Sequence, residues 1–112
     1  MVETRRMDDW LRELLSELRE GLETLYGERL KGFYLYGSRA RGEAKPESDV
    51  DVLIVLDKVE HYYGELERTG ELVSDVSLRY DVTVSRVLIS ESQWDEGDEP
   101  FLLTVREDAV AA

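Results

Sequence analysis

Asp49 and Asp51 stand two residues apart, where a polar stretch gives way to the apolar run VLIVL. Side chains at this spacing on a β-strand project from the same face, so the two carboxylates are expected to lie together. Two like charges this close are costly unless a cation lies between them, and carboxylate oxygens suit Mg²⁺ or Mn²⁺. A single Asp-x-Asp at a strand start is more often simply solvated. The pair alone therefore gives a hypothesis of a divalent-metal site.

A second feature strengthens this hypothesis. Gly37 and Ser38 end another strand-like segment. Glycine lets the backbone approach a phosphate closely, and Ser38 offers a hydroxyl at the start of a helical turn whose free N–H groups favour anions. Singly, Gly-Ser is usually a plain turn, and Arg39 and Arg41 are ordinary surface charges. Jointly, the features predict a site for a metal–triphosphate.

The elements that position these residues follow from the apolar pattern. Apolar residues at helical spacing predict helices over 5–26 and 61–79. Alternating patterns predict strands over 31–36, 49–56 and 80–89. Both faces of the strand over 49–56 are apolar, which is typical of a central strand covered on two sides.

The strand over 80–89 matters for the site because it is expected to carry a polar face. Its core-facing residues are Tyr80, Val82 and Val84, and its outward residues are Asp81, Thr83 and Ser85. At Arg86 the alternation slips and Val87 becomes part of the apolar set. This slip predicts a bulge or a strand end.

Shorter elements complete the chain. We expect a helical turn over 38–41 and a polar loop over 42–48. Ser90 and Gln93 form a capping-box pattern for a short helix that carries Trp94, and 101–110 predicts a last helix. The order predicts an α/β (α+β) fold, with helices packed on a small mixed sheet.

Length and composition bound the function. With 112 residues, we expect one domain over 1–112. The net charge of −12 repels phosphate backbones, which argues against direct nucleic-acid binding but not against a nucleotide held locally with metal ions. The chain has no cysteine and one histidine, which excludes thiolate sites and argues against a His-rich metal site. Without a signal-peptide pattern or a membrane-length apolar run, we expect a cytoplasmic protein that does not contact membranes.

The segment GSRARGEAKPESDVDVLIVL, residues 37–56, closely resembles the signature of the DNA polymerase β-like nucleotidyltransferase superfamily. The shared pattern is Gly-Ser, a short turn that ends in Gly42, a polar loop, and Ser48-Asp-x-Asp on a strand. The eleven-residue spacing from Ser38 to Asp49 also agrees. The short chain resembles the minimal nucleotidyltransferases, and the likeness extends over most of residues 10–110.

This resemblance implies roles for particular residues. Asp49 and Asp51 would ligate two divalent metal ions, Mg²⁺ or Mn²⁺, and a third carboxylate on a later strand would complete the set. Asp81 is the candidate for that third catalytic ligand. Asp75 is a rival that falls late in a helix, and Asp57 lies at the far end of its strand. Should Asp81 lie away from the pair, nucleotide binding without transfer becomes an open alternative.

The resemblance also implies a nucleotide site. Gly37 and Ser38 would hold the β- and γ-phosphates, with Arg39, Arg41 and Ser48 as further nucleotide-binding candidates. Two residues apart on a helical turn, the two arginines are not expected to face the ligand together. The implied reaction transfers a nucleoside monophosphate, AMP from ATP, to an acceptor hydroxyl and releases pyrophosphate.

Minimal nucleotidyltransferases are often paired with HEPN-domain toxins, so the implied acceptor is a tyrosine of such a toxin and the implied role is that of an antitoxin. Two alternatives stay open. In the first, the chain is a non-catalytic antitoxin that blocks its toxin by contact. In the second, it is a nucleotidyltransferase for a small molecule with a separate acceptor-binding subunit. A homodimer is a further expectation, since a minimal domain can bury exposed apolar surface that way.

Overall fold

The computed structural model describes residues 7–112. Helices and strands alternate through most of this range, as the apolar periodicity predicted. The helices are α1 (Asp9–Tyr26), η1 (Gly27–Arg29), α2 (Ser38–Arg41), α3 (Tyr62–Tyr80), α4 (Glu91–Glu96) and α5 (Pro100–Asp108). The strands are β1 (Leu30–Tyr36), β2 (Val50–Leu56), β3 (Val84–Ser90) and β4 (Val110–Ala111).

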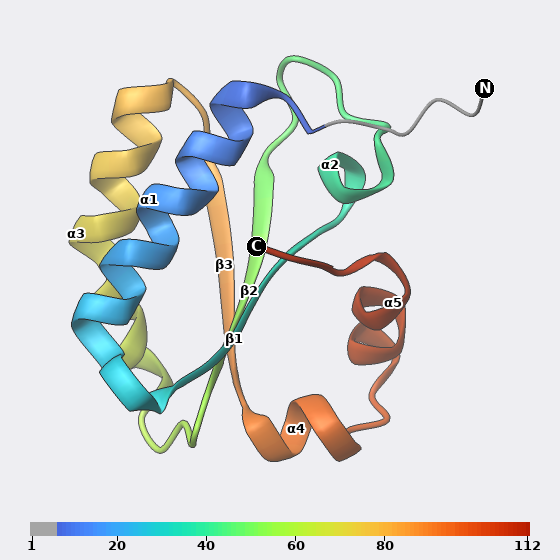
Figure 1. The fold of residues 1–112 in the computed structure, drawn as a ribbon. Helices are drawn as coiled ribbons and strands as arrows, with labels where there is room; N and C mark the ends of the chain where they lie inside the picture. Colours follow the sequence, from blue (N-terminus) through green and yellow to red (C-terminus); the bar gives the residue numbers. More distant parts are fainter. Residues whose placement is uncertain (1–6) are drawn as a thin grey trace.

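The four strands form one mixed sheet in the order β3-β2-β1-β4. β1 pairs antiparallel with β2 and β4, whereas β2 and β3 run parallel. Helices cover both faces of the sheet, with α1 and α3 on one side and α4 and α5 on the other (Figure 1). This arrangement confirms the predicted α/β class and the predicted central position of β2.

The core is divided by the sheet into two clusters. The larger one packs the apolar stripe of α1, including Leu14, Leu18 and Leu22, against the sheet residues that face α1 and α3. The smaller one packs Leu53 and Val55 of β2 against α5 on the other face. β2 is therefore apolar on both sides because each side meets a helical layer.

The start of β3 differs from the prediction. Tyr80 is the last residue of α3, and Asp81 is the C-cap, in the left-handed conformation with φ 51°. β3 itself begins at Val84. The alternation over 80–83 resembled a strand because the end of an amphipathic helix and a short connection can place apolar residues two apart.

No bulge occurs at Arg86, since the pairing of β2 with β3 is continuous from Val84 to Ser90. Arg86 occupies a core-facing position toward α3, where its guanidinium donates to Thr69 Oγ1 at 2.7 Å and to the Leu66 carbonyl at 2.7 Å. An arginine whose guanidinium is hydrogen-bonded to α3 thus occupies a position where the alternation predicts an apolar residue. Val87 packs against the core cluster on the opposite face. The apparent slip is a polar substitution on an ordinary strand.

The elements near both ends of the chain also differ from the prediction. The first helix begins at Asp9, while residues 5 and 6 of the predicted helix lie outside the described part of the chain. The capping box of Ser90 and Gln93 is present, and the last helix is confirmed but ends at Asp108. β4, which pairs with β1, was not expected.

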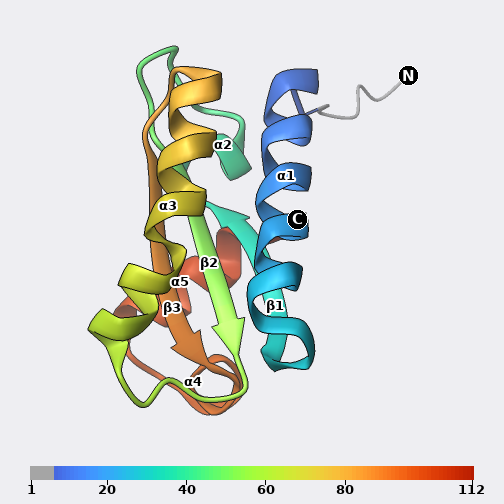
Figure 2. The same cartoon turned by 90° about the vertical axis from the view of Figure 1, so that its left-hand side faces the viewer.

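A view turned by 90° shows α1 and α3 side by side on the same face of the sheet, with β2 and β3 running in the same direction behind the two helices (Figure 2). β1 runs the opposite way, so the end of β1 meets the starts of β2 and β3 at one end of the sheet. None of the helices in residues 7–112 combines the length and the apolar character that a bilayer crossing requires.

Candidate active site

The Asp49–Asp51 pair lies at this end of the sheet. Asp51 is directly opposite Tyr36, the last residue of β1, and Gly37 follows at once. Tyr36 packs edge-on against Phe101 of α5, with ring centroids 5.8 Å apart. The β1–β2 pairing therefore brings the Gly-Ser motif and the Asp-x-Asp motif together, as the sequence predicted.

Position 37 requires a glycine because the backbone there passes close to the carboxylate of Asp51. Its φ is 77°, in the left-handed region that side chains rarely adopt. A Cβ atom added at this position would lie 2.5 Å from Oδ2 of Asp51. The glycine thus lets the turn after β1 pass close to the carboxylate.

The two aspartates differ in environment. Asp51 is partly buried, whereas Asp49 is exposed. Burial, and then the negative charge of Asp49, raise the pKa of Asp51 above its ordinary value, while Arg39 and Arg41 act in the opposite direction. The Ser85 hydroxyl donates to Oδ2 of Asp49 across 3.4 Å. The pair is a concentrated negative site that a cation would stabilise.

Ser38 begins α2, as expected. The amides of Ala40 and Arg41 donate to the Gly37 carbonyl at 3.1 Å, and Gly42 ends the turn in the left-handed conformation. The Gly-Ser motif therefore forms a compact helical turn directly after β1, beside Asp51.

Arg39 and Ser48 brace the loop between α2 and β2. Arg39 stacks over the Trp10 ring, 4.9 Å from its centroid, and donates to the Ser48 carbonyl at 2.6 and 3.2 Å. The Ser48 hydroxyl accepts from the backbone amide of Lys45 at 2.9 Å. These contacts fix the loop that carries the chain into Asp49.

Arg41 reaches a different part of the molecule. It donates to Oδ2 of Asp108, at the end of α5, at 2.7 Å and to Glu43 at 3.1 Å. The two arginines thus contact different elements of the structure.

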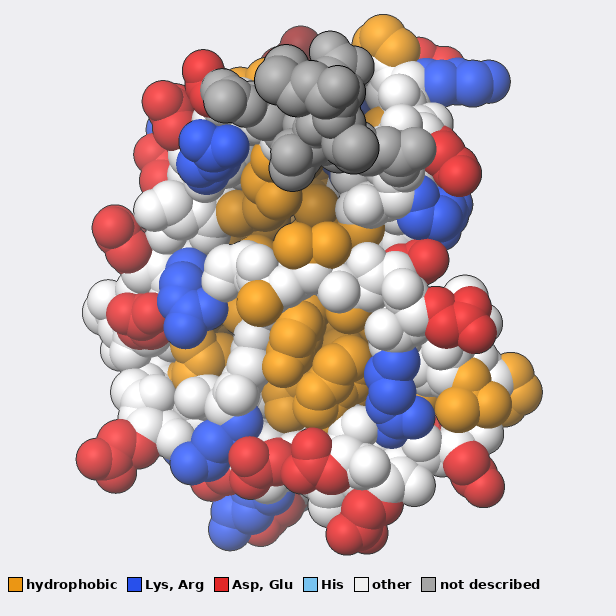
Figure 3. All heavy atoms as spheres, turned by 45° about the vertical axis from the view of Figure 1, so that its right-hand side comes forward, with side chains coloured by type: hydrophobic (Ala, Val, Ile, Leu, Met, Phe, Trp, Pro, Cys, Tyr) orange, Lys and Arg blue, Asp and Glu red, His pale blue; other side chains and the backbone are white. Residues whose placement is uncertain are grey.

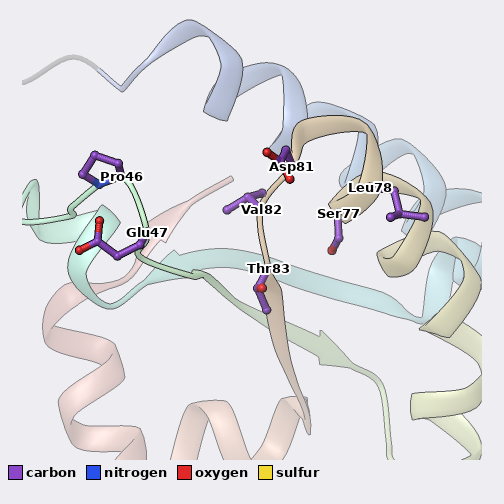
Figure 4. Close-up of a pocket in the computed structure, with 7 residues that line it drawn as sticks. All are labelled: Pro46, Glu47, Ser77, Leu78, Asp81, Val82 and Thr83. Carbon is purple, nitrogen blue, oxygen red and sulfur yellow. The ribbon is translucent and has the colours of Figure 1, made fainter.

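Asp81 is not part of this group. As the C-cap of α3 it lines a hollow of about 440 Å³ between the end of α3 and the loop before β2 (Figure 4). Pro46 and Glu47 form the other wall of that hollow. Within residues 7–112, no group of three Asp, Glu or His side chains is placed to hold a metal ion. The expected three-carboxylate set of Asp49, Asp51 and Asp81 is therefore not assembled.

The residues present fit a divalent cation in a simpler way. Asp49 and Asp51 offer oxygen ligands from one face of β2, and Gly37 leaves the Asp51 carboxylate uncovered by a side chain. Mg²⁺ is commonly bound by one or two carboxylates together with substrate phosphates. Two carboxylates can thus hold one cation that also contacts a nucleotide.

Sequence reasoning missed Ser85 and Asp108 as neighbours of the site. Ser85 was placed on the polar side of its strand, but only the β2–β3 register shows that it lies opposite Asp51. Asp108 is distant in sequence and reaches Arg41 through the packing of α5. No local pattern signals either contact.

Comparisons with known proteins agree with this geometry. Residues 15–98 match the nucleotidyltransferase domain family. Two proteins of Methanocaldococcus jannaschii, both described as proposed protein adenylyltransferases, are 31% identical over 71% of this chain and 80% of theirs, and 30% identical over 73% and 76%.

Solved structures share the fold. A proposed nucleotidyltransferase from Sulfolobus solfataricus superposes with a TM-score of 0.61 at 21% identity, over 99% of this chain and 89% of that one. A proposed minimal nucleotidyltransferase gives 0.62 at 23% identity, over 96% and 98%. A toxin–antitoxin structure with AMP-PNP gives 0.59 at 16%, over 86% and 69%. By its family match and its relatives, the chain belongs to the nucleotidyltransferase domain family.

Proposed function

We propose that this nucleotidyltransferase transfers AMP from ATP to a hydroxyl group of a protein. The observation that carries the proposal is the Asp49–Asp51 pair, which lies against Gly37 at the end of β1. Two relatives described as proposed protein adenylyltransferases support the choice of donor and acceptor class.

In this proposal, Asp49 and Asp51 would bind a divalent cation, with Mg²⁺ preferred and Mn²⁺ accepted. A bound cation would offset phosphate charge and lower the pKa of a bound hydroxyl. Gly37 and Ser38 would hold the β- and γ-phosphates beside it. A second ion, which the resemblance implies, would need its remaining ligands from the nucleotide, because Asp81 lies elsewhere.

The transfer itself is balanced as follows. The acceptor oxygen bonds to the α-phosphorus, and the bond from that phosphorus to the bridging oxygen breaks. Pyrophosphate leaves with the electron pair of the broken bond, and the hydroxyl proton passes to solvent. Arg39 and Ser48 would contribute by fixing the loop before Asp49, since their polar groups are bonded within it. Arg41 would contribute positive charge near Asp51.

The finer proposal concerns the acceptor. We propose a tyrosine of a HEPN-domain toxin, with this chain as the antitoxin, on the basis of the sequence resemblance and of toxin–antitoxin structures among the fold neighbours. The net charge of −12 favours a basic partner. One face of the molecule has an apolar centre bordered by both acidic and basic side chains (Figure 3).

The test uses ATP labelled on the α-phosphate, Mg²⁺, and lysate of the source cell. Wild type is compared with Asp49→Asn/Asp51→Asn and with Asp95→Asn/Asp98→Asn, which removes two acidic charges from the end of α4 and the loop that follows it. We expect a labelled protein band with wild type and the loop variant, and none with the site variant. The mass of the labelled protein identifies the partner.

Other results would contradict parts of the proposal. Pyrophosphate release without a labelled protein indicates a small-molecule acceptor. No release, combined with toxin neutralisation that survives Asp49→Asn/Asp51→Asn, indicates an antitoxin that acts by contact. A labelled band that persists in the site variant would contradict the assignment of the two aspartates.

A further inference from the structure

Ser85 lies opposite Asp51 in the parallel pairing of β2 with β3. The preceding pair in the register, Val50 and Val84, is buried in the core cluster beneath α1 and α3. Because successive side chains of a strand alternate between faces, Asp51 and Ser85 project from the opposite face. Ser85 is thus the position of β3 that directly faces the carboxylate pair.

Ser85 also contacts the other aspartate. Its hydroxyl donates to Oδ2 of Asp49 across 3.4 Å. A neutral donor restrains this exposed carboxylate without adding negative charge beside Asp51. The serine therefore links both members of the pair, one by register and one by a hydrogen bond.

The same position is where a carboxylate would complete a three-acid set. Asp81, the candidate from the sequence, caps α3 and lines the hollow beside Glu47. Within the part of the chain that the structure describes, no third acid joins Asp49 and Asp51. β3 instead presents a serine hydroxyl to the pair.

We propose that Ser85 is a positioning residue that holds Asp49 for cation binding, at the place where a third carboxylate ligand would otherwise stand. This inference rests on the proposed function, since it takes Asp49 and Asp51 as the cation ligands. Removal of the hydroxyl would free the Asp49 side chain. An aspartate at position 85 would instead add a third oxygen ligand to the site.

The test measures Mn²⁺ affinity of the whole chain, without nucleotide, by the electron paramagnetic resonance of free Mn²⁺. Ser85→Ala should weaken binding about three- to tenfold, the effect of one lost hydrogen bond. Ser85→Thr keeps the hydroxyl and should bind as wild type does. Ser85→Asp should tighten binding about tenfold, because ligand charge sets affinity in oxygen sites. Ser16→Asp on the exposed face of α1 adds the same charge elsewhere and should change little.

Thermal unfolding by circular dichroism checks that each variant folds, and Ser85→Ala decides the question if Ser85→Asp does not fold. Equal Mn²⁺ affinity of wild type and Ser85→Ala, in folded proteins, overturns the role of Ser85. If Asp49→Asn/Asp51→Asn loses Mn²⁺ binding in the same experiment, the proposed metal site stands and only the positioning role fails. If that variant binds Mn²⁺ as wild type does, both proposals fail.

Discussion

Carboxylates at the two ends of the sheet have opposite environments. At the end away from the site, Glu65 is 6% exposed and accepts hydrogen bonds from Tyr26 at 2.8 Å, Arg68 at 3.0 Å and Arg29 at 3.1 Å. Burial alone would raise the pKa of Glu65, but these three donors outweigh it and lower the pKa. At the site end, burial and Asp49 raise the pKa of Asp51.

This difference separates a structural carboxylate, Glu65, from Asp51, whose proposed role is to bind a cation. Glu65 has its positive partners within the chain, so its charge joins α3 to α1 and η1. Asp51 is instead crowded by a like charge and meets the backbone of Gly37. The partner that would neutralise the Asp49–Asp51 pair is therefore expected to come from outside the chain.

Neutralising the Asp49–Asp51 pair is expected to have the largest effect on activity. Asp49→Asn/Asp51→Asn should lower AMP transfer by about 1,000-fold, equivalent to about 4 kcal/mol of activation free energy. The variant should stay folded, since removal of two adjacent like charges relieves repulsion. Initial rates with labelled ATP and a thermal melt check both statements. Unfolding of this variant would mean that the pair has a structural role like that of Glu65.

Glu65→Ala should have the converse effect. It leaves Tyr26, Arg29 and Arg68 without their common acceptor and should lower the free energy of unfolding by about 2–3 kcal/mol. Urea unfolding measures the change, with Glu67→Ala, an exposed residue of the same helix, as the control. At temperatures where it is folded, Glu65→Ala should retain AMP transfer. A large loss of activity in the folded variant would contradict the separation of roles.

Gly37→Ala tests the importance of the contact between Gly37 and Asp51. The new Cβ would overlap Oδ2 of Asp51, so we expect at least about a tenfold loss of activity and a loss of about 1–3 kcal/mol in stability. Gly27→Ala is the matched control, because Gly27 also has a positive φ, 54°, but has no atom within 4 Å of the added Cβ. It should lose stability without losing activity. Equal activity of the two variants would show that the Gly37–Asp51 contact is unimportant.

The two pKa shifts predict opposite dependences of stability on pH. Because the pKa of Glu65 is lowered in the folded state, ionised Glu65 stabilises the fold at pH values above its ordinary pKa of 4.5. This contribution is lost as pH falls through the folded-state pKa. The raised pKa of Asp51 acts in reverse, since the folded state gains a proton before the unfolded state does. Asp51→Asn should therefore raise stability near pH 7 and make the loss of stability on acidification steeper, whereas Glu65→Gln should flatten the loss below pH 4.5. Melting temperatures from pH 7 to 3 check both directions.

The smallest expected effect concerns Arg39. Arg39→Lys loses the paired contact with the Ser48 carbonyl and part of the stacking on Trp10, because an ammonium is not planar. We expect about a two- to fivefold rise in the KM for ATP and a loss of about 0.5–1 kcal/mol in stability. Steady-state kinetics and melting measure these changes. Unchanged kinetics would mean that the loop before Asp49 holds its shape without Arg39.

Local patterns predicted most of the fold and the closeness of Gly37 to Asp51. The Gly-Ser motif directly follows β1 and the Asp-x-Asp motif stands at the start of the adjacent antiparallel β2, so the two strand patterns suffice to place Gly37 beside Asp51. The error at Asp81 arose where helix and strand patterns overlap, because two apolar residues two apart fit either. The role of Ser85 required the register of a parallel pair, which depends on how α3 packs rather than on nearby residues. The prediction of a bulge or strand end at Arg86 was wrong for a similar reason, since its partners Thr69 and Leu66 come from α3.

The parallel pairing of β2 with β3 also has a consequence for how the protein folds. β1 and β2 are joined by residues 37–49, which include α2, whereas β3 can pair with β2 only after the longer passage through all of α3. Contacts between residues far apart in sequence carry a larger loop-closure entropy and tend to form later. We therefore expect the β1–β2 pair to bring Gly37 to Asp51 early, and Ser85 to reach Asp49 only in the final stage of folding.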